Sequence, residues 1–269
     1  MSSDSLDASI IVLFLDGSPW IGECVDAIKR NATEHLRYEI IVLANGVNDA
    51  AALPVHDDDV VRVLRTRVNL GFAGGCNWAA RHARGRYNVL LNDDTEVEPG
   101  WLDALVSATG PSVGAVGSLI AGYDDVVEEA GRVLWRDGVG SAFMHGTRMA
   151  DAGRGPTRSV DYCSAASLLV TREAWQQCGG FDTRYYPAYY EDADLCLELR
   201  RRGWRTLATT ASRVRHRRSV STSMLWRRFL GLRNHRVFTE KWADVLAGFP
   251  QRPHDDVSAV ELERLGARS

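Results

Sequence analysis

Short apolar runs rich in β-branched residues alternate with segments of helical periodicity along the first half of the chain. Between the first two runs, apolar residues recur every three or four positions from Ile21 to Ile28, as on one face of a helix. Strands buried on both faces are apolar throughout, so the runs themselves predict strands, at residues 9–15, 39–43, 60–64 and 87–91. This alternation predicts βαβ crossovers, and with them an α/β fold whose mostly parallel, Rossmann-like central sheet is flanked by helices.

The second half of the chain is less regular. Its apolar runs predict two further strands, at 114–120 and 166–170, while residues 126–135 fit either a strand or irregular structure. The glycine-rich residues 137–158 predict a long loop, and loops of this length in compact domains are often functional.

Helix boundaries in the second half are marked by their capping residues. Thr171 stands where it would cap a helix over 172–178, and Gly179 where that helix would end. A later helix over 195–202 would be ended in the same way by Gly203.

Composition narrows the class of protein. The 269 residues are 45% hydrophobic and 25% charged, which suits one large α/β domain or two small lobes that share a core. The net charge of −3 excludes a generally basic protein that coats nucleic acid, and no segment is apolar for the length of a membrane span. The start of the chain is polar and acidic, unlike a signal peptide. Five cysteines without a C-x-x-C pair argue against structural zinc and a disulfide framework, so a reduced, cytoplasmic compartment is expected.

The fourth predicted strand ends in Asn92, Asp93 and Asp94. In open α/β sheets, ligands bind beyond the carboxyl ends of the strands. Adjacent aspartates repel each other and lose hydration there, and a divalent cation would compensate both effects. The alternative is a polar turn that begins a helix at Thr95, with Pro99 near the first helical position. Both interpretations can hold together, because a cap needs only one of the side chains.

A glycine-rich run over 69–77 leads into a predicted small-residue helix over 78–83. The run follows the third strand, and its glycines do not match the order of the dinucleotide fingerprint G-x-G-x-x-G. Glycines of this kind let the backbone pass close to a ligand or a neighbouring strand, which would bring Phe72 and Asn77 near a sugar or a phosphate. A tight turn before the helix is the alternative.

Residues 191–194 place three carboxylates at the start of the later predicted helix. The helix dipole favours carboxylates at an N-terminus, and this alone is a sufficient explanation. An aromatic run directly before them suggests more, because tyrosines and a proline form a platform on which sugar faces stack while a carboxylate takes a hydroxyl proton. That run contains Tyr185, Tyr186, Pro187, Tyr189 and Tyr190.

Three segments, in this order and at this spacing, resemble family 2 glycosyltransferases of the GT-A fold, close to the bacterial rhamnosyltransferase-type members. They are residues 69–77, residues 91–94, and residues 179–182 followed by 191–196. The resemblance covers about residues 9–221, most of the chain. It implies a nucleotide-sugar-binding half at 1–110, an acceptor-binding half of the same domain at 111–221, and a C-terminal helical extension at 222–269.

The resemblance implies a metal ion and a catalytic base. Asn92, Asp93 and Asp94 correspond to the family's D-x-D-type motif, which contacts the donor ribose and holds Mn²⁺ or Mg²⁺ on the diphosphate, and Asn92 replaces a more usual aspartate. Asp94 matches the metal ligand, and His216 would complete the metal site. Asp192 matches the general base that takes the proton of the acceptor hydroxyl. At a helix N-terminus this carboxylate is expected to stay ionised and to be only weakly basic.

Donor and acceptor contacts follow from the same resemblance. Donor contacts are expected from Asp16, Asn45, Asn69, Gly71, Phe72, Gly75, Asn77, Asn92 and Asp93. Acceptor contacts are expected from Tyr189, Tyr190 and Glu191. The second strand ends in Ala44 and Asn45, where the family commonly has an aspartate that reads the nucleobase. Base recognition would therefore shift to Asn45, Asp16, Asp49 or backbone groups, and a dTDP- or UDP-linked, rhamnose-like sugar is the expected donor.

The implied activity is a metal-dependent transfer of a sugar from a nucleoside diphosphate to an acceptor hydroxyl, in one displacement that inverts the anomeric carbon. No Ser-His-Asp or Cys-His pattern suggests a covalent nucleophile. Two alternatives stay open. A nucleotidyltransferase acting on sugar phosphates would need basic residues after the first strand, and residues 16–19 contain none. A non-catalytic sugar-nucleotide-binding protein would not need the Asp192 carboxylate.

Residues 213–239 carry eight arginines and no acidic residue in a chain that is net acidic. Interleaved apolar residues predict an amphipathic basic helix, which would rest on anionic lipid, contact a lipid-phosphate acceptor, or cover the domain with its apolar side. The expected acceptor is a glycan, a lipid-linked molecule or a small molecule, and the expected location is the cytoplasm or the inner face of a membrane. Residues 251–269 predict a short helix or a frayed tail.

Overall fold

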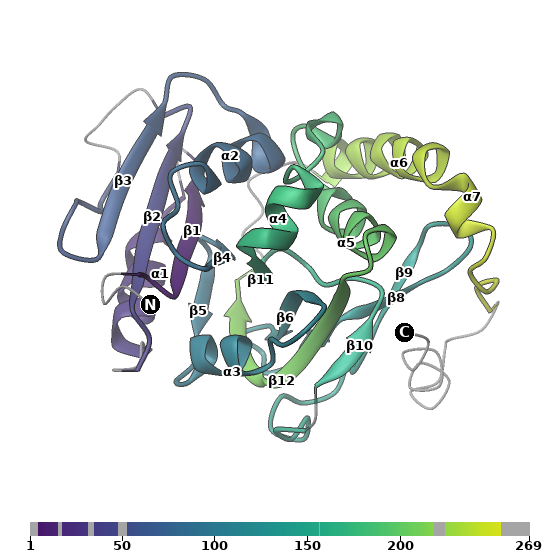
Figure 1. The fold of residues 1–269 in the computed structure, drawn as a ribbon, viewed down its shortest axis with the longest axis horizontal. Helices are drawn as coiled ribbons and strands as arrows, with labels where there is room; N and C mark the ends of the chain where they lie inside the picture. Colours follow the sequence, from purple (N-terminus) through teal and green to yellow (C-terminus); the bar gives the residue numbers. More distant parts are fainter. Residues whose placement is uncertain are drawn as a thin grey trace.

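The computed structural model describes residues 5–15, 18–31, 35–47, 53–155, 157–217 and 224–253. Within them, ten strands form one sheet and two short strands form a separate hairpin (Figure 1). The strands of the sheet are β1 (Ala8–Phe14), β2 (Tyr38–Asn45), β3 (Val61–Thr66), β4 (Tyr87–Asn92), β5 (Thr95–Val97), β6 (Val113–Ala121), β7 (Val127–Glu129), β10 (Arg158–Val160), β11 (Ser167–Thr171) and β12 (Arg205–His216). The hairpin pairs β8 (Arg132–Leu134) with β9 (Gly140–Ala142).

The sheet has the order β10-β12-β6-β11-β4-β1-β2-β3, with β5 on β12 and β7 on β6. Strands β1 to β4 pair in parallel, as the alternation of strands and helices predicts. Strand β11 runs antiparallel between β4 and β6 and so joins the two halves of a mixed sheet. Every residue of β1 is buried, which explains its nearly continuous apolar run.

Helices cover both faces of the sheet. Successive strand residues point to opposite faces, so Ile10 and Ile11 of β1 enter different cores. The Ile10 side packs against α1 (Ile21–Asn31) and α3 (Trp101–Ser107). The Ile11 side packs against α2 (Gly71–Ala80), α4 (Arg172–Cys178) and α5 (Glu191–Arg201).

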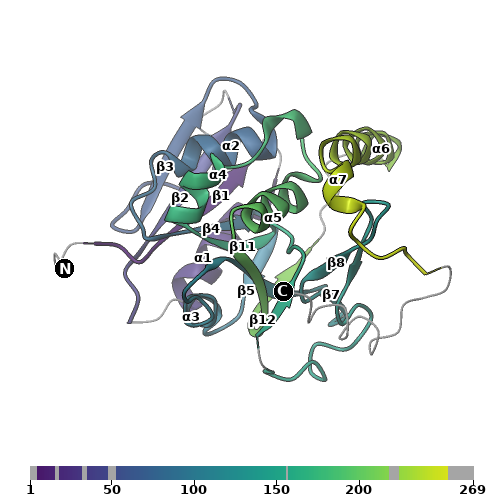
Figure 2. The same cartoon turned by 45° about the vertical axis from the view of Figure 1, so that its right-hand side comes forward.

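A third, smaller core holds the C-terminal helices. α6 (Met224–Lys241) and α7 (Ala243–Leu246) pack outside α5 and beside the β8–β9 hairpin, as both views of the ribbon show (Figures 1 and 2). The short 3₁₀ turn η2 (Thr183–Tyr185) is pinned in the same core by the buried Tyr185. The helical extension predicted after residue 222 is therefore confirmed between 224 and 246. The tail prediction falls mainly on residues 254–269, which lie outside the described residues.

Two predicted helix positions are wrong. The chain after Asp94 does not begin a helix, because residues 95–97 form β5 against β12, and α3 starts only after Gly100. The glycine-rich run is not a loop before a helix, because it forms α2 itself from Gly71 onward. Small residues allow this helix to lie close to the sheet: a Cβ on Gly75 would come within 2.6 Å of Leu13 Cδ2.

The predicted capping residues are confirmed. Thr171 Oγ1 accepts a hydrogen bond of 3.2 Å from the Ala174 amide at the start of α4, and Gly179 ends that helix with a left-handed φ of 76°. The ambiguous segment 126–135 contains β7 and β8. The predicted loop over 137–158 contains β9 and a series of tight turns, so it is shorter than expected.

Candidate active site

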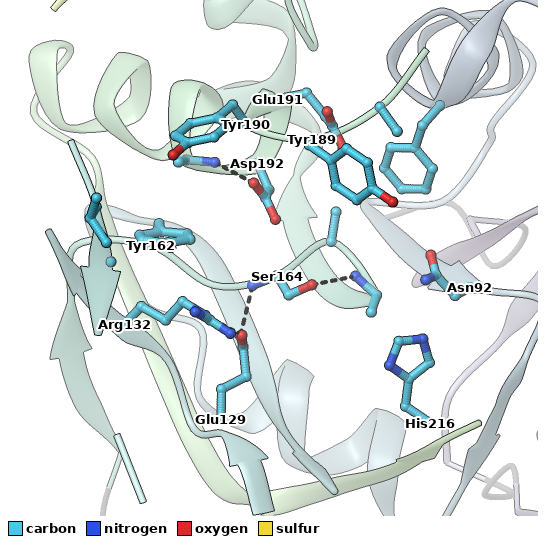
Figure 3. A pocket seen from close by; sticks show the side chains of 17 residues that line it. Asn92, Glu129, Arg132, Tyr162, Ser164, Tyr189, Tyr190, Glu191, Asp192 and His216 are labelled. Carbon is cyan, nitrogen blue, oxygen red and sulfur yellow. Dashed lines mark hydrogen bonds and ion pairs between the residues drawn. The ribbon is translucent and has the colours of Figure 1, made fainter. Parts of the chain in front are cut away.

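A cavity of about 490 Å³ lies where the ends of β4 and β12, the hairpin β8–β9 and the start of α5 converge. Seven of the predicted site residues line it: Phe72, Asn92, Tyr189, Tyr190, Glu191, Asp192 and His216. Figure 3 shows acidic and aromatic side chains entering the cavity from above, and Asn92 and His216 lying at one side of it. The sequence-predicted acceptor residues and the strand-end residues therefore face one cavity, although about a hundred positions separate them.

Asp192 is the second residue of α5, and its side chain points into the cavity (Figure 3). The pKa of Asp192 is raised to about 6: burial is the largest cause and the nearby Glu129 carboxylate adds to it, while the Ala193 amide and the Arg132 guanidinium favour the charged form and oppose the rise. The Ala193 amide donates to Asp192 Oδ1 at 2.8 Å. The expected weak basicity is thus wrong, because burial outweighs the helix N-terminus. A carboxylate with this pKa is ionised at neutral pH and still a useful base.

Glu191, the first residue of the same helix, is 6% exposed and also lines the cavity. Burial and the neighbouring Asp192 carboxylate hold the pKa of Glu191 well above its usual range. Its Oε2 atom has no hydrogen-bond partner among the described residues. Buried polar atoms are rarely left unpaired in folded proteins, so this oxygen is suited to bind a hydroxyl group of a ligand.

The third carboxylate of the helix start turns away from the cavity. Asp194 Oδ1 accepts hydrogen bonds from the Tyr185 hydroxyl at 2.9 Å and from Trp242 Nε1 at 2.7 Å. Lys241 Nζ lies 2.7 Å from the same oxygen. Asp194 therefore ties α5 to the C-terminal helices, and only the first two carboxylates of the motif face the cavity.

The loop before α5 holds its tyrosines in an unusual backbone conformation. Tyr189 and Tyr190 have left-handed φ values of 83° and 76°. Such strain persists only where the surroundings impose it, and here the buried Asn234 amide donates to the carbonyls of Ala188 at 2.8 Å and Tyr189 at 3.0 Å. Tyr189 stays 41% exposed at the rim of the cavity.

At the other side of the cavity, His216 lies between two carboxylates. Its Nε2 is 3.2 Å from Asp94 Oδ1, and its Nδ1 is 3.5 Å from Glu128 Oε2. Burial lowers the pKa of His216, but the two carboxylates outweigh burial and raise this pKa to about 9. Burial, together with the adjacent Asp94, raises the pKa of Asp93 to about 6. Crowded, desolvated carboxylates next to an imidazole are the surroundings that a divalent cation would stabilise.

The protein alone does not supply a complete set of ligands for such a cation. The described residues contain no cluster of three or more His, Cys, Asp or Glu side chains arranged to hold a metal. Asp94 and His216 are close enough to share one ion, and Mg²⁺ is often held by one or two protein groups together with substrate phosphates and water. The residues present fit a metal that arrives with a diphosphate, rather than a permanent metal centre.

Among the other lining residues, none of which the sequence motifs predict, three are charged or aromatic: Glu129, Arg132 and Tyr162. Arg132 Nε donates to Glu129 Oε2 at 2.5 Å, and the Ser164 amide donates to Glu129 Oε1 at 2.9 Å (Figure 3). The Arg132 guanidinium lies 5.9 Å from the centre of the Tyr162 ring. The only signal in the sequence was the run of charged residues within 126–135, a segment with no clear secondary structure.

Four of the residues predicted to contact the donor make contacts within the protein. Asn45 Oδ1 accepts from the Leu70 amide at 2.9 Å, and Asn69 Oδ1 accepts from the Gly71 amide at 2.8 Å, so both side chains shape the start of α2. Asn77 bonds to both backbone groups of Phe181, at 2.8 Å each. Gly75 packs against Leu13 of β1, as described above. Asp16 and Asp49 lie outside the described residues.

Comparisons with known proteins point to one enzyme family. Residues 9–140 match the family model described as Glycosyl transferase family 2. The chain belongs to this family. The chain is 31% identical over 223 residues to the O-antigen biosynthesis protein RfbC of Myxococcus xanthus, an alignment that covers 79% of this chain and 17% of that protein. It is 31% identical over 191 residues to an N-acetylglucosaminyl-diphospho-decaprenol L-rhamnosyltransferase of Mycobacterium tuberculosis, covering 60% of each.

Solved structures of glycosyltransferases share the fold. The structure of GalNAc-T7 with UDP, GalNAc and Mn²⁺ aligns with a TM-score of 0.70 at 15% identity, covering 98% of this chain and 54% of that one. The mannosyltransferase PcManGT from Pyrobaculum calidifontis, in complex with GDP-Man and Mn²⁺, aligns with a TM-score of 0.63 at 16% identity, covering 98% and 68%. The predicted GT-A fold of this family 2 member is therefore confirmed.

The alignments also set limits. The chain spans between about a sixth and three fifths of the length of the curated relatives compared above. Among the described residues, none of the helices has the length and apolar character needed to cross a bilayer.

Proposed function

We propose that this family 2 member is an inverting glycosyltransferase that moves a sugar from a nucleoside diphosphate to an acceptor hydroxyl. The observation that supports it most is the Asp192 carboxylate, which enters one cavity opposite the strand-end residues Asn92 and His216 and has a pKa of about 6. A donor at the strand ends would present its anomeric carbon toward α5, and the acceptor would enter past Tyr189. Residues 1–110 would bind the donor and residues 111–221 the acceptor.

In the proposed reaction the acceptor oxygen attacks the anomeric carbon while Asp192 takes its proton. The new carbon–oxygen bond forms as the bond to the diphosphate breaks, and the electron pair leaves with the diphosphate. Attack from the side opposite the leaving group inverts the anomeric carbon. Glu191, with a raised pKa and an unpaired Oε2, would hold a second hydroxyl of the acceptor and so orient the attacking one.

Asp94 and His216 would hold a divalent cation, with Mn²⁺ favoured over Mg²⁺ by the imidazole ligand. When bound, it would offset the negative charge that develops on the leaving diphosphate. Asn92 faces the cavity from the end of β4 and would contact the ribose or the phosphates. Both structural neighbours described above were solved with Mn²⁺ and a nucleotide or nucleotide sugar, which supports this part of the proposal.

We propose a dTDP- or UDP-linked, rhamnose-like sugar as the donor and a lipid-linked glycan as the acceptor. The support is the rhamnosyltransferase relative, whose name specifies a diphospho-decaprenol acceptor. None of the described residues is an evident partner for the nucleobase, because the Asn45 side chain is hydrogen-bonded to the backbone at the start of α2.

The deciding experiment is a panel of nucleotide sugars, assayed with Mn²⁺, with Mg²⁺ and with EDTA. Metal-dependent release of nucleoside diphosphate, and a rise in melting temperature with the same donor, are the expected results. Binding raises stability by RT ln(1 + [L]/Kd), roughly 2.7 kcal/mol at a hundredfold excess over Kd. Full turnover in EDTA would refute the metal assignment, and a clear preference for a guanosine diphosphate sugar would refute the donor assignment. Donor binding without any transfer to a lipid-linked acceptor would favour a binding protein instead.

A further inference from the structure

Helix α6 has two apolar faces, and only one of them is covered. Leu230, Asn234 and Phe238 recur four residues apart and are at most 4% exposed, and Phe238 packs in the core around α5. On the opposite side, Leu225 is 82% exposed and Leu232 is 65% exposed. The covered face accounts for the stability of the helix, so the second apolar face needs another explanation.

The uncovered face is a continuous patch rather than scattered residues. Positions 225, 229 and 232 follow the spacing i, i+4, i+7 and lie on one side of a helix. Phe229 is 54% exposed, and Trp226, 48% exposed, stacks against it with ring centroids 5.4 Å apart. We call these four residues, Leu225, Trp226, Phe229 and Leu232, the outer face of α6.

Basic residues border the outer face. Arg228 is exposed at its edge, Arg236 is exposed on the same side of the helix and pairs with Glu240, and α6 contains no acidic residue before Glu240. Arg233, next in sequence to Leu232, is bound through Nη1 to the Tyr186 carbonyl at 2.7 Å. Leucine, tryptophan and phenylalanine flanked by arginines form the composition of a helix that lies in the interface of an anionic bilayer. An ordinary protein–protein contact would explain the apolar residues but not the one-sided charge.

The position of the outer face relative to the cavity also suits a membrane. The covered side of α6 supplies Asn234, whose amide donates to the carbonyls of Tyr185, Ala188 and Tyr189. The same helix therefore shapes the loop at the rim of the cavity, in which Tyr186 is 49% exposed and Tyr189 is 41% exposed. Figures 1 and 2 show α6 running along the outside of the molecule, on the side of α5.

We infer that the outer face of α6 is a docking surface for an anionic lipid bilayer. The apolar side chains insert among the lipids, and Arg228, at the edge of the outer face, lies at the level of the headgroup phosphates. Docking in this way holds the rim loop close to the bilayer. The inference does not depend on the proposed function, since it concerns only where the helix binds.

The test is co-sedimentation of the purified full chain with phosphatidylcholine vesicles and with vesicles containing about 30% phosphatidylglycerol. We expect binding to the anionic vesicles, with a shift of tryptophan fluorescence to shorter wavelength as Trp226 leaves water. Phe229→Glu combined with Leu232→Glu should lower the partition coefficient at least tenfold. Val68→Glu is the matched control, because Val68 is 63% exposed on a loop of the donor half, and it should change partition less than twofold.

A second variant separates charge from apolar insertion. Arg228→Gln should lower partition into anionic vesicles by roughly fivefold and leave partition into neutral vesicles unchanged. All three substituted positions are exposed, so the melting temperature should stay within about a degree of the parent, which a thermal scan verifies.

Three results would overturn the inference. One is the absence of binding to either vesicle. Another is equal partition of the Phe229→Glu, Leu232→Glu variant and the parent. The third is a parent that sediments as a dimer without lipid and becomes a monomer in that variant, since the outer face would then be an interface between two copies of the chain.

Discussion

The surroundings of Asp192 shift the pKa of its carboxyl group in opposite directions. Burial and Glu129 raise its pKa, and the Ala193 amide and Arg132 lower it, with a balance near 6. We predict that Asp192→Asn, which keeps the shape and removes the base, lowers kcat by roughly 10²–10⁴-fold with little change in donor binding. In the parent, kcat/KM should rise with pH through about 6 and then level off. The measurements are initial rates across pH and a donor titration.

The matched control is Asp194→Asn, which removes a carboxylate of the same helix that faces away from the cavity. It should destabilise the fold and leave the pH profile of the remaining activity in place. Near-normal turnover by Asp192→Asn would mean that another residue is the base.

The same pKa has a consequence for stability. Between pH of about 4, where an exposed aspartate titrates, and about 6, native Asp192 binds more protons than the unfolded chain does. Stability from this group is therefore fully present below the lower pKa and is lost as pH rises through this window. We predict that the melting temperature of Asp192→Asn, relative to the parent, increases from pH 4 to pH 7. A difference that is flat across the window would show that Asp192 does not carry the raised pKa.

Glu128 contacts His216 on the side of the imidazole ring away from Asp94. Its Oε2 lies 3.5 Å from Nδ1, while Nε2 faces Asp94. A carboxylate on one imidazole nitrogen fixes the ring and its tautomer for metal binding through the other. We predict that Glu128→Gln weakens Mn²⁺ binding in the presence of UDP by roughly 10–100-fold, measured by electron paramagnetic resonance titration. Glu240→Gln, on an exposed pair with Arg236, is the control and should leave Mn²⁺ affinity unchanged. Equal affinities in the two variants would remove Glu128 from the metal site.

At the level of single residues, the sequence predicts what lies in compact motifs. Asn92 and Asp192 face one cavity because each sits at the end or start of a regular element. Glu128, Glu129 and Arg132 were missed because their position depends on β7 pairing with β6 and on the β8–β9 hairpin. Those pairings join short strands through irregular backbone, so no local periodicity reveals them.

At the level of elements, α2 shows how a glycine can position the loop before α5. Gly71 has a φ of +70°, and a Cβ there would come within 2.8 Å of the Pro187 carbonyl oxygen. The Phe72 amide donates to that same carbonyl at 2.7 Å. We predict that Gly71→Ala lowers the free energy of unfolding by at least about 2 kcal/mol and raises the acceptor KM, because backbone strain and overlap displace the loop. Urea unfolding and acceptor titration measure the two effects.

Gly22→Ala is the matched control for this change. Gly22 lies in α1, and a Cβ there would meet no atom within 4 Å. Alanine should be neutral or stabilising at that position, by up to about 1 kcal/mol. Comparable stability of the two variants would show that the contact between α2 and the loop is not tight.

The hydropathy pattern predicts the elements whose buried side chains are apolar. It does not predict strand β12, because several buried side chains of this strand carry hydroxyl groups, among them Thr209, Thr210 and Ser212. These side chains are satisfied inside the sheet: Ser212 Oγ pairs with Ser118 Oγ at 2.8 Å, and Thr210 Oγ1 accepts from the Gly155 amide at 2.9 Å. Only tertiary partners make such a strand stable, so its pairing cannot be read from local sequence.

At the level of the whole molecule, the proposed donor and acceptor halves share one framework. Arg217, next to His216 at the end of β12, forms an ion pair of 2.6 Å with Glu23 of α1. Its guanidinium also lies 4.1 Å from the Trp20 ring and 4.2 Å from the Tyr123 ring. The site is therefore assembled across the full sheet, and the alternation of strands and helices predicts the parallel part of that sheet but not the antiparallel join at β11.

The division near residue 110 should therefore be one of function and not of folding. Strand β4 hydrogen-bonds along its length to β11 of the second half. The buried Trp101 of α3 donates from Nε1 to Ser167 Oγ at 2.9 Å and accepts from Ser212 Oγ at 3.0 Å, so the first half depends on partners from the second. We predict one cooperative thermal transition for the full chain. Residues 1–110 alone, with the β4 edge and the core side of α3 exposed, should show no cooperative unfolding by circular dichroism and should aggregate. A fragment 1–110 that unfolds cooperatively and binds nucleoside diphosphate would show instead that the donor half is an independent domain, and that the acceptor half folds onto it.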